Sequence, residues 1–93
     1  MTKNEIAQEI IRRVEGSETV NYAAWTVGLT HNPQERQTQH EADGKDIQHW
    51  MQWVADSLDE AQDVESYFIN EKGMKGGTGG NLSPSRTVYV YIF

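Results

Sequence analysis

The segment at residues 25–40, WTVGLTHNPQERQTQH, constrains the fold of this chain more than any other. Its first six residues alternate between apolar side chains and small or polar ones, which is the period of a half-buried strand. Asn32 is a good helix cap, Pro33 suits the first helical position, and Glu35 lies three residues after the cap. The segment therefore predicts a strand, a tight turn and the start of a helix.

The predicted helix, from Pro33 to about Glu41, has no apolar face. Arg36 and His40 lie one turn apart on it, because they are four residues apart. A helix that is polar all round does not serve to fill a core. Arg36 and His40 are therefore candidate functional residues, although a solvated surface pair is the plainer interpretation.

Two further helices are predicted by their caps and apolar stripes. Thr2 and Glu5 have capping-box spacing, and an amphipathic helix follows as far as Val14. Ser57 and Glu60 form a second capping box, which begins a helix from residue 58 to about residue 72. The two helices require an apolar surface to pack against.

The remaining segments are less regular. Residues 47–55 fit either a helix or a short strand, since periodicity cannot decide so short an apolar run. Residues 73–85 form a glycine-rich loop, and residues 87–93, TVYVYIF, are dense in β-branched and aromatic side chains and predict a final strand. The expected fold class is α/β (α+β), with a small antiparallel three-stranded sheet flanked by about three helices.

Composition limits the classes of protein that this chain can belong to. Its 93 residues are enough for a single domain, expected over residues 1–93. It has no cysteine, no apolar run of membrane-spanning length and no apolar stretch of signal-peptide type at its start, so we expect a cytoplasmic protein with no membrane partner. The formal net charge of −6 opposes long-range attraction to nucleic acid.

The strand, turn and helix resemble the second strand and following helix of the GIY-YIG nuclease superfamily. Thr26, Val27 and Gly28 correspond to the Y-I-G letters, and Arg36 corresponds to the catalytic arginine, followed four residues later by His40. Downstream, Ala61 and Glu65 resemble the family's alanine and glutamate helix, whose glutamate binds a single divalent metal, and Asn81 matches a late asparagine. The resemblance covers about residues 24–68, with the last strand as a possible addition.

The chain departs from the family pattern in two places. Thr26 replaces the tyrosine of the second motif, and no G-I-Y strand precedes Trp25. One arrangement repairs the second departure: the C-terminal strand takes the place of the missing first strand beside residues 25–30, as in a permuted relative. That arrangement would bring Tyr89 or Tyr91 to the site from the far end of the chain, and would make residues 50–55 a third strand.

The resemblance implies phosphodiester hydrolysis with Mg²⁺ or Mn²⁺. Glu65 would hold the metal, Arg36 would bind the scissile phosphate, and a tyrosine (Tyr89 or Tyr91) or His40 would act as general base on water. A solvated face is the plainer interpretation of Glu65 in its acidic helix. Basic residues Lys72 and Lys75 at the start of the glycine loop are candidate nucleic-acid contacts, while Trp50 and Trp53 are more often core residues than base-stacking ones.

Three interpretations follow. The incomplete catalytic set and the acidic charge favour a GIY-YIG-like module that binds nucleic acid or protein without catalysis. The alternative is a small divalent-metal-dependent endonuclease that uses Arg36, His40 and Glu65, and it requires these groups and a tyrosine hydroxyl to converge on one concave site. In the third interpretation the resemblance is accidental and the chain is an unrelated α/β domain.

Overall fold

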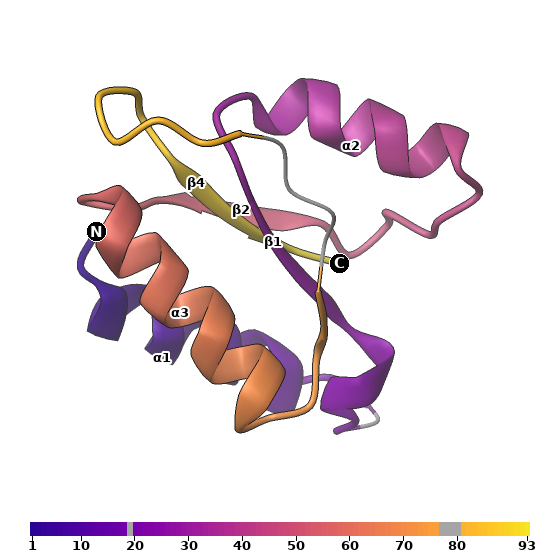
Figure 1. The fold of residues 1–93 in the computed structure, drawn as a ribbon. Helices are drawn as coiled ribbons and strands as arrows, with labels where there is room; N and C mark the ends of the chain where they lie inside the picture. The colour runs from indigo at the N-terminus through magenta and orange to yellow at the C-terminus, as the bar shows by residue number, and fades with distance from the viewer. Residues whose placement is uncertain (19, 77–80) are drawn as a thin grey trace.

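Four strands form one mixed sheet with helices on both of its faces (Figure 1). The computed structural model describes residues 1–18, 20–76 and 81–93. In chain order the elements are α1 (Lys3–Glu15), the 3₁₀ helix η1 (Tyr22–Ala24), β1 (Thr26–Thr30), α2 (Pro33–Ala42), β2 (Met51–Val54), α3 (Leu58–Asn70), β3 (Lys75–Gly76) and β4 (Tyr89–Ile92). The α+β class is the one that the sequence predicts.

The C-terminal strand β4 lies inside the sheet, whose strand order is β2-β4-β1-β3. It runs antiparallel to both neighbours, and Tyr91 pairs with Gly28 of β1 on one side and with Gln52 of β2 on the other. Two expectations are thereby confirmed: the last strand lies beside the strand at residues 26–30, and the ambiguous segment at residues 47–55 contains a strand.

The expected three-stranded antiparallel sheet is wrong in its strand number and in part of its direction. The fourth strand, β3, pairs parallel to β1, with Thr26 opposite Lys75 and Val27 opposite Gly76. Two residues inside a glycine-rich segment carry no periodic pattern, so nothing in the sequence distinguishes this strand from loop. The remainder of the predicted glycine loop includes residues 77–80, which lie outside the described part of the chain.

The helices begin where their caps predict. Thr2 Oγ1 accepts the Glu5 N–H at 3.2 Å and the Glu5 carboxylate accepts the Thr2 N–H at 2.8 Å, which completes the capping box of α1. Ser57 Oγ accepts the Glu60 N–H at 3.1 Å at the start of α3. Within the described residues, no helix is long and apolar enough to cross a bilayer.

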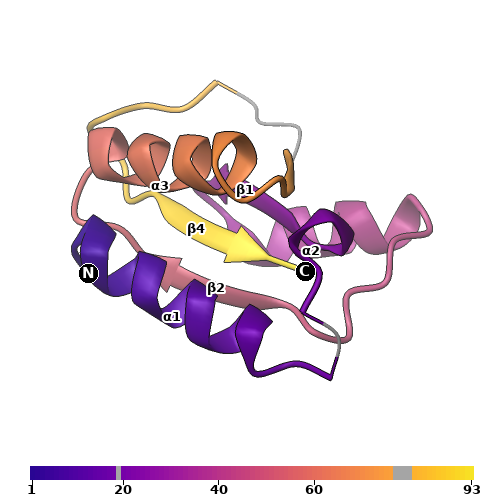
Figure 2. The same cartoon turned by 90° about the horizontal axis from the view of Figure 1, so that it is seen from below.

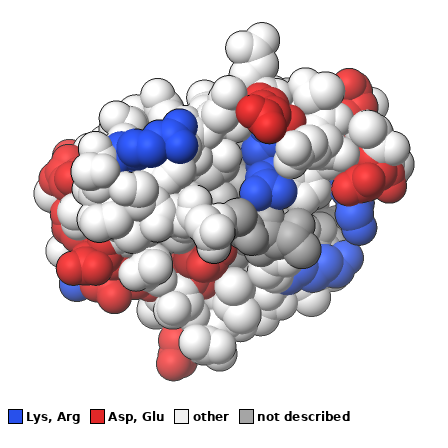
Figure 3. Space-filling model, turned by 45° about the horizontal axis from the view of Figure 1, so that its top comes forward, with Lys and Arg blue, Asp and Glu red and all other residues white. Residues whose placement is uncertain are grey.

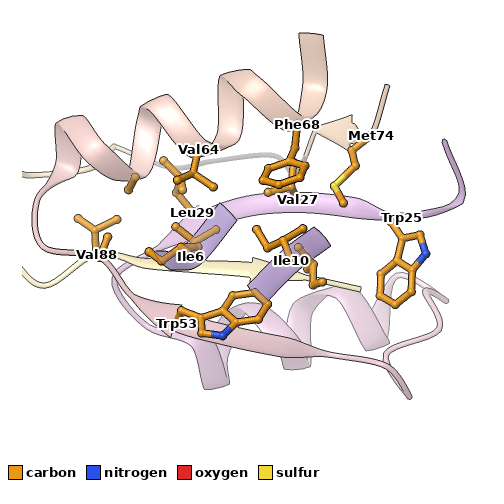
Figure 4. Packing of buried hydrophobic residues seen from close by; sticks show 14 of the residues in the cluster. Ile6, Ile10, Trp25, Val27, Leu29, Trp53, Val64, Phe68, Met74 and Val88 are labelled. Atoms are coloured by element: carbon orange, nitrogen blue, oxygen red, sulfur yellow. The ribbon is translucent and has the colours of Figure 1, made fainter. Parts of the chain in front are cut away.

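The apolar core lies between one face of the sheet and helices α1 and α3. Figure 2 shows these two helices side by side on that face, with β4 visible between them. Side chains from both helices and from the strands point toward one another in Figure 4. The fully or nearly fully buried residues at the centre are Ile6, Ile10, Val27, Leu29, Val64, Phe68, Val90 and Ile92.

Helix α2 covers the opposite face of the sheet and is attached differently (Figure 1). His40 is its only buried residue. Its first turn is held by Asn32, whose Oδ1 accepts the Glu35 N–H at 3.1 Å. The core therefore does not depend on α2, and the polar side chains of that helix remain available for other contacts.

Candidate functional site

The hydroxyl of Tyr91 is the centre of the site between α2 and the sheet. Tyr91 is fully buried on β4, and it lies directly opposite Gly28 of β1. A Cβ atom at position 28 would come within 2.9 Å of Tyr91 Cε2 and closer still to Cζ and Oη. Only glycine leaves room for the tyrosine ring to lie across β1, so Gly28 positions the hydroxyl.

His40 binds this hydroxyl from α2. Its Nε2 lies 3.0 Å from Tyr91 Oη, and the imidazole is 7% exposed. Burial lowers the pKa of His40, and the nearby Arg36 guanidinium lowers it further. The imidazole is therefore neutral at pH 7 and able to accept a proton.

The pKa of Tyr91 is raised to about 12, mainly by burial. The charge of Arg36 opposes this rise and the charge of Glu65 adds to it. Since a phenol with this pKa remains protonated at neutral pH, Tyr91 can donate its proton to His40 Nε2.

Arg36 and Glu65 reach the site from different helices. Each is half-buried, and among the described residues neither side chain forms a hydrogen bond or an ion pair. Burial raises the pKa of Glu65, which means that the folded chain disfavours its charged form. Half-buried charges without a partner are costly, and they are typical of sites where a ligand supplies the missing charge.

A cavity of about 190 Å³ lies beside the first half of α2; we call it the Arg36 cavity. His31 holds the loop before β4 against it, because its Nδ1 donates to the Thr87 carbonyl at 2.8 Å and its Nε2 accepts the Ser83 N–H at 2.8 Å. The loop thereby brings further polar groups to the cavity. Its polar lining includes Asn32, Glu35, Arg36, Gln39, Asn81 and Arg86.

A second cavity, of about 250 Å³, lies beside the end of α2; we call it the His40 cavity. It is lined by His40 and Phe93 together with Lys45 and Lys75, and by Asp43 and Thr26. The buried His40 thus lines a space that two lysines also line.

Basic side chains gather at these two cavities, although Glu35 lines the first and Asp43 lines the second. Four of the eight basic residues of the chain line them, although the formal net charge is −6. Figure 3 looks on to the α2 side of the molecule and shows basic groups in separate places, with acidic groups near some of them. The arrangement favours a few discrete phosphate contacts over a broad basic surface. The four residues are Arg36, Arg86, Lys45 and Lys75.

A layer of aromatic rings lies next to the Tyr91 hydroxyl. Trp50 stacks on Tyr91 with ring centroids 4.5 Å apart and an interplanar angle of 10°. Phe93 stacks on Trp50 at 5.5 Å and contacts the His40 ring at 4.6 Å. The layer fixes the orientation of Tyr91 and explains why its ring is fully buried.

The residues expected to form the site are only partly brought together. His40 contacts the Tyr91 hydroxyl, and Asn81 lines the Arg36 cavity together with Arg36. Glu65 lies on α3 and is linked to Tyr91 only by the effect of its charge on the pKa of Tyr91. The other expected residues lie in three different places. Lys75 lines the His40 cavity; Lys72 lies over the Tyr22 ring at 5.4 Å; Tyr89 is half-buried at the start of β4, opposite Thr30 and Val54.

Sequence reasoning missed Arg86 and Lys45 and treated Trp50 as a core residue. Arg86 and Lys45 lie in loops, where no periodic pattern indicates which way a side chain points. Trp50 precedes β2 and is not part of the apolar cluster, which contains Trp25 and Trp53. The alternation of side chains along a strand was the signal that could have separated the two tryptophans. Trp50 and Trp53 are three residues apart, so they lie on opposite faces.

The residues at the site can accommodate a divalent cation through one carboxylate. Within the described residues no group of three or more His, Cys, Asp or Glu side chains could hold a metal. Mg²⁺ is commonly bound by one or two carboxylates, several waters and substrate phosphate oxygens. The half-buried, unpaired Glu65 fits that type of site, and its pKa would fall on binding a cation.

The chain was compared with protein-family models, curated proteins and solved structures, and none of them matches it significantly.

Proposed function

We propose that this chain hydrolyses phosphodiester bonds in nucleic acid, as a divergent and permuted GIY-YIG-like domain that depends on a divalent metal. One observation carries the proposal: the unpaired Arg36 and Glu65 both act on the hydroxyl that His40 binds. The incomplete motif favours a binding module. The enzyme interpretation requires these groups to converge on one site, and the effect of both charges on the Tyr91 hydroxyl supports it.

Arg36 binds the scissile phosphate in this proposal. Its planar guanidinium can form two parallel hydrogen bonds to phosphate oxygens, and it lines the Arg36 cavity. Asn81 and Arg86 line the same cavity and are placed to contact the same or a neighbouring phosphate. These contacts orient the phosphorus for attack by water.

Tyr91 and His40 together accept the proton of the attacking water. As Tyr91 Oη takes a proton from water, its own proton passes to the neutral Nε2 of His40, 3.0 Å away. The water oxygen then forms the new bond to phosphorus, and the bond to the leaving oxygen breaks. A divalent cation bound at Glu65 would stabilise the negative charge on that leaving oxygen.

The buried hydroxyl requires a path for substrate. Tyr91 is fully buried in this structure, while His40 is the only buried residue of α2. We therefore expect α2 to move when substrate binds. The complete burial of Tyr91, and Thr26 in place of the second family tyrosine, support the second candidate function, which is phosphate binding without cleavage.

The test is a cleavage assay with labelled single-stranded, duplex and branched nucleic acids in Mg²⁺, Mn²⁺ or EDTA. We expect metal-dependent cleavage that falls about 100-fold or more in Arg36→Ala and in Glu65→Gln. Arg12→Ala is the control, because Arg12 is exposed on α1 and pairs only with Glu9 among the described residues.

Binding is measured in parallel by fluorescence anisotropy in EDTA. Glu65→Gln should bind as the wild type does, because it removes the metal ligand and leaves Arg36 in place. Binding without cleavage by the wild type would favour the second candidate. Neither binding nor cleavage of any of these substrates would overturn both.

A further inference from the structure

Trp50 lies outside the apolar core, and its role is not explained by packing alone. It is half-buried immediately before β2, whereas Trp25 and Trp53 are 9% and 8% exposed within the core. Tyr91 and Phe93 stack on the indole at 4.5 and 5.5 Å. Trp50 is therefore the most exposed of the three tryptophans.

The indole of Trp50 is held in one orientation. Its Nε1 donates a hydrogen bond to Gln52 Oε1 at 2.9 Å, on the exposed side of β2. Its interplanar angles with Tyr91 and Phe93 are 10° and 16°, so the three rings lie nearly parallel. A flat ring fixed in this way loses little conformational entropy when another ring stacks on it.

The aromatic surface adjoins the cationic site. Trp50 lies 6.3 Å from the His40 ring, and both His40 and Phe93 line the cavity that contains Lys45 and Lys75. Aromatic rings beside a positively charged groove are the combination that proteins use to bind single-stranded nucleic acid, since bases stack on the rings while the cations bind the backbone.

We propose that Trp50 is a stacking platform for an unpaired nucleobase, so that the substrate of this site is a nucleic acid with single-stranded nucleotides. The inference rests on the proposed function, in that it takes the Arg36 and His40 cavities as the phosphate contacts. Inside a duplex both faces of a base are covered by its neighbours, so a base can stack on Trp50 only if it is unpaired or extruded. Because every base has a π-face, the platform favours no particular sequence.

The experiment compares an oligothymidine strand, the same strand with abasic sites in place of its bases, and a matched duplex. Affinities are measured by fluorescence anisotropy in EDTA for the wild type, Trp50→Ala, Trp50→Phe and Arg36→Ala. Val54→Ala is the control, because Val54 is 44% exposed on β2, the strand that follows Trp50. Circular dichroism verifies that each variant is folded.

We expect Trp50→Ala to weaken binding of the oligothymidine strand about tenfold and to leave binding of the abasic strand unchanged. Trp50→Phe should retain most of the affinity, because it keeps an aromatic face. Arg36→Ala should weaken binding of the oligothymidine strand and of the abasic strand by the same factor. Oligothymidine should also quench the fluorescence of the wild type and not that of Trp50→Phe.

The possible failures are distinguishable. If Arg36→Ala weakens binding while Trp50→Ala affects the two strands equally or not at all, the platform is refuted and the proposed function stands. Tighter binding of the duplex than of the single strand would refute the platform in the same way. If the wild type binds none of the three nucleic acids, both the stacking platform and the proposed function are overturned.

Discussion

Replacing Gly28 by alanine tests the packing that positions the Tyr91 hydroxyl. Gly28 lies opposite Tyr91 in the β1–β4 pair, and its φ is not positive, so the backbone itself accepts alanine. The new Cβ would come within 2.9 Å of Tyr91 Cε2 and closer still to Cζ and Oη, where ordinary contacts begin at 3.4 Å. The Tyr91 ring must therefore move, or the two strands must separate.

The expected cost is a decrease of about 2–4 kcal/mol in the free energy of unfolding. Overpacking of a well-packed site typically costs about 1–3 kcal/mol. Displacing the ring also weakens the hydrogen bond between Tyr91 and His40, which is worth about 1 kcal/mol. In a domain of this size such a loss lowers Tm by roughly 10–25 °C, and the variant remains folded if the total stability is about 5–15 kcal/mol.

The assay is urea unfolding followed by circular dichroism, with Gly76→Ala as the matched control. A Cβ at Gly76 of β3 would meet only the flexible end of Ile69, at 3.1 Å, so this change should cost less than about 1 kcal/mol. The Tyr91→Leu background removes the ring atoms that would clash. Gly28→Ala should cost less than about 1 kcal/mol in that background, which gives a large coupling energy in the double-mutant cycle.

Two results would refute this reasoning. The first is a cost for Gly28→Ala that is no greater than the cost for Gly76→Ala. The second is a cost that stays the same in the Tyr91→Leu background, because the strain would then come from an atom other than those of the tyrosine ring.

Three further predictions concern charge and capping. Glu65→Gln should raise the urea midpoint at pH 7 and lose this advantage below about pH 4.5, because burial raises the pKa of Glu65 and so penalises its ionised form. Because the pKa of His40 is lowered in the folded chain, neutral His40 contributes its full share of the stability above about pH 6.5. This contribution is lost as the pH falls below about 6.5 toward the folded pKa. The unfolding midpoint of His40→Gln should not show this decline. Thr2→Ala should cost about 1 kcal/mol in thermal or urea unfolding through loss of the α1 cap, whereas Thr38→Ala, on the exposed side of α2, should cost less.

The sequence predicts the helices well because their caps are local. Thr2, Asn32 and Ser57 each accept the N–H of the residue three positions later, so neighbouring residues contain the signal. The end of α3 was placed two residues too late, because Glu71 and Lys72 are compatible with a helix and only Gly73, with its positive φ, ends the pattern.

The sheet and the site were predicted less completely, because they depend on contacts between distant residues. The pairing of β4 with β1 was proposed from a family resemblance, whereas the parallel pairing of Lys75 with Thr26 has no local signal. His40 was identified from its helix, but its partner Tyr91 is 51 residues away. Arg86 reaches the Arg36 cavity only because His31 holds the loop at residues 83–87.

The two faces of the sheet differ, because one carries the apolar core and the other carries the candidate site. Helices α1 and α3 bury their apolar stripes on one face, and this packing accounts for the core. On the other face, α2 buries only His40, and its free energy of docking is correspondingly small. In the proposed function, substrate would therefore displace α2 to reach Tyr91 at little cost to the core. A polar helix whose only buried residue is a histidine is consistent with the movement that the proposed function requires. For that reason the absence of an apolar face at residues 33–42 was the most informative feature of the sequence.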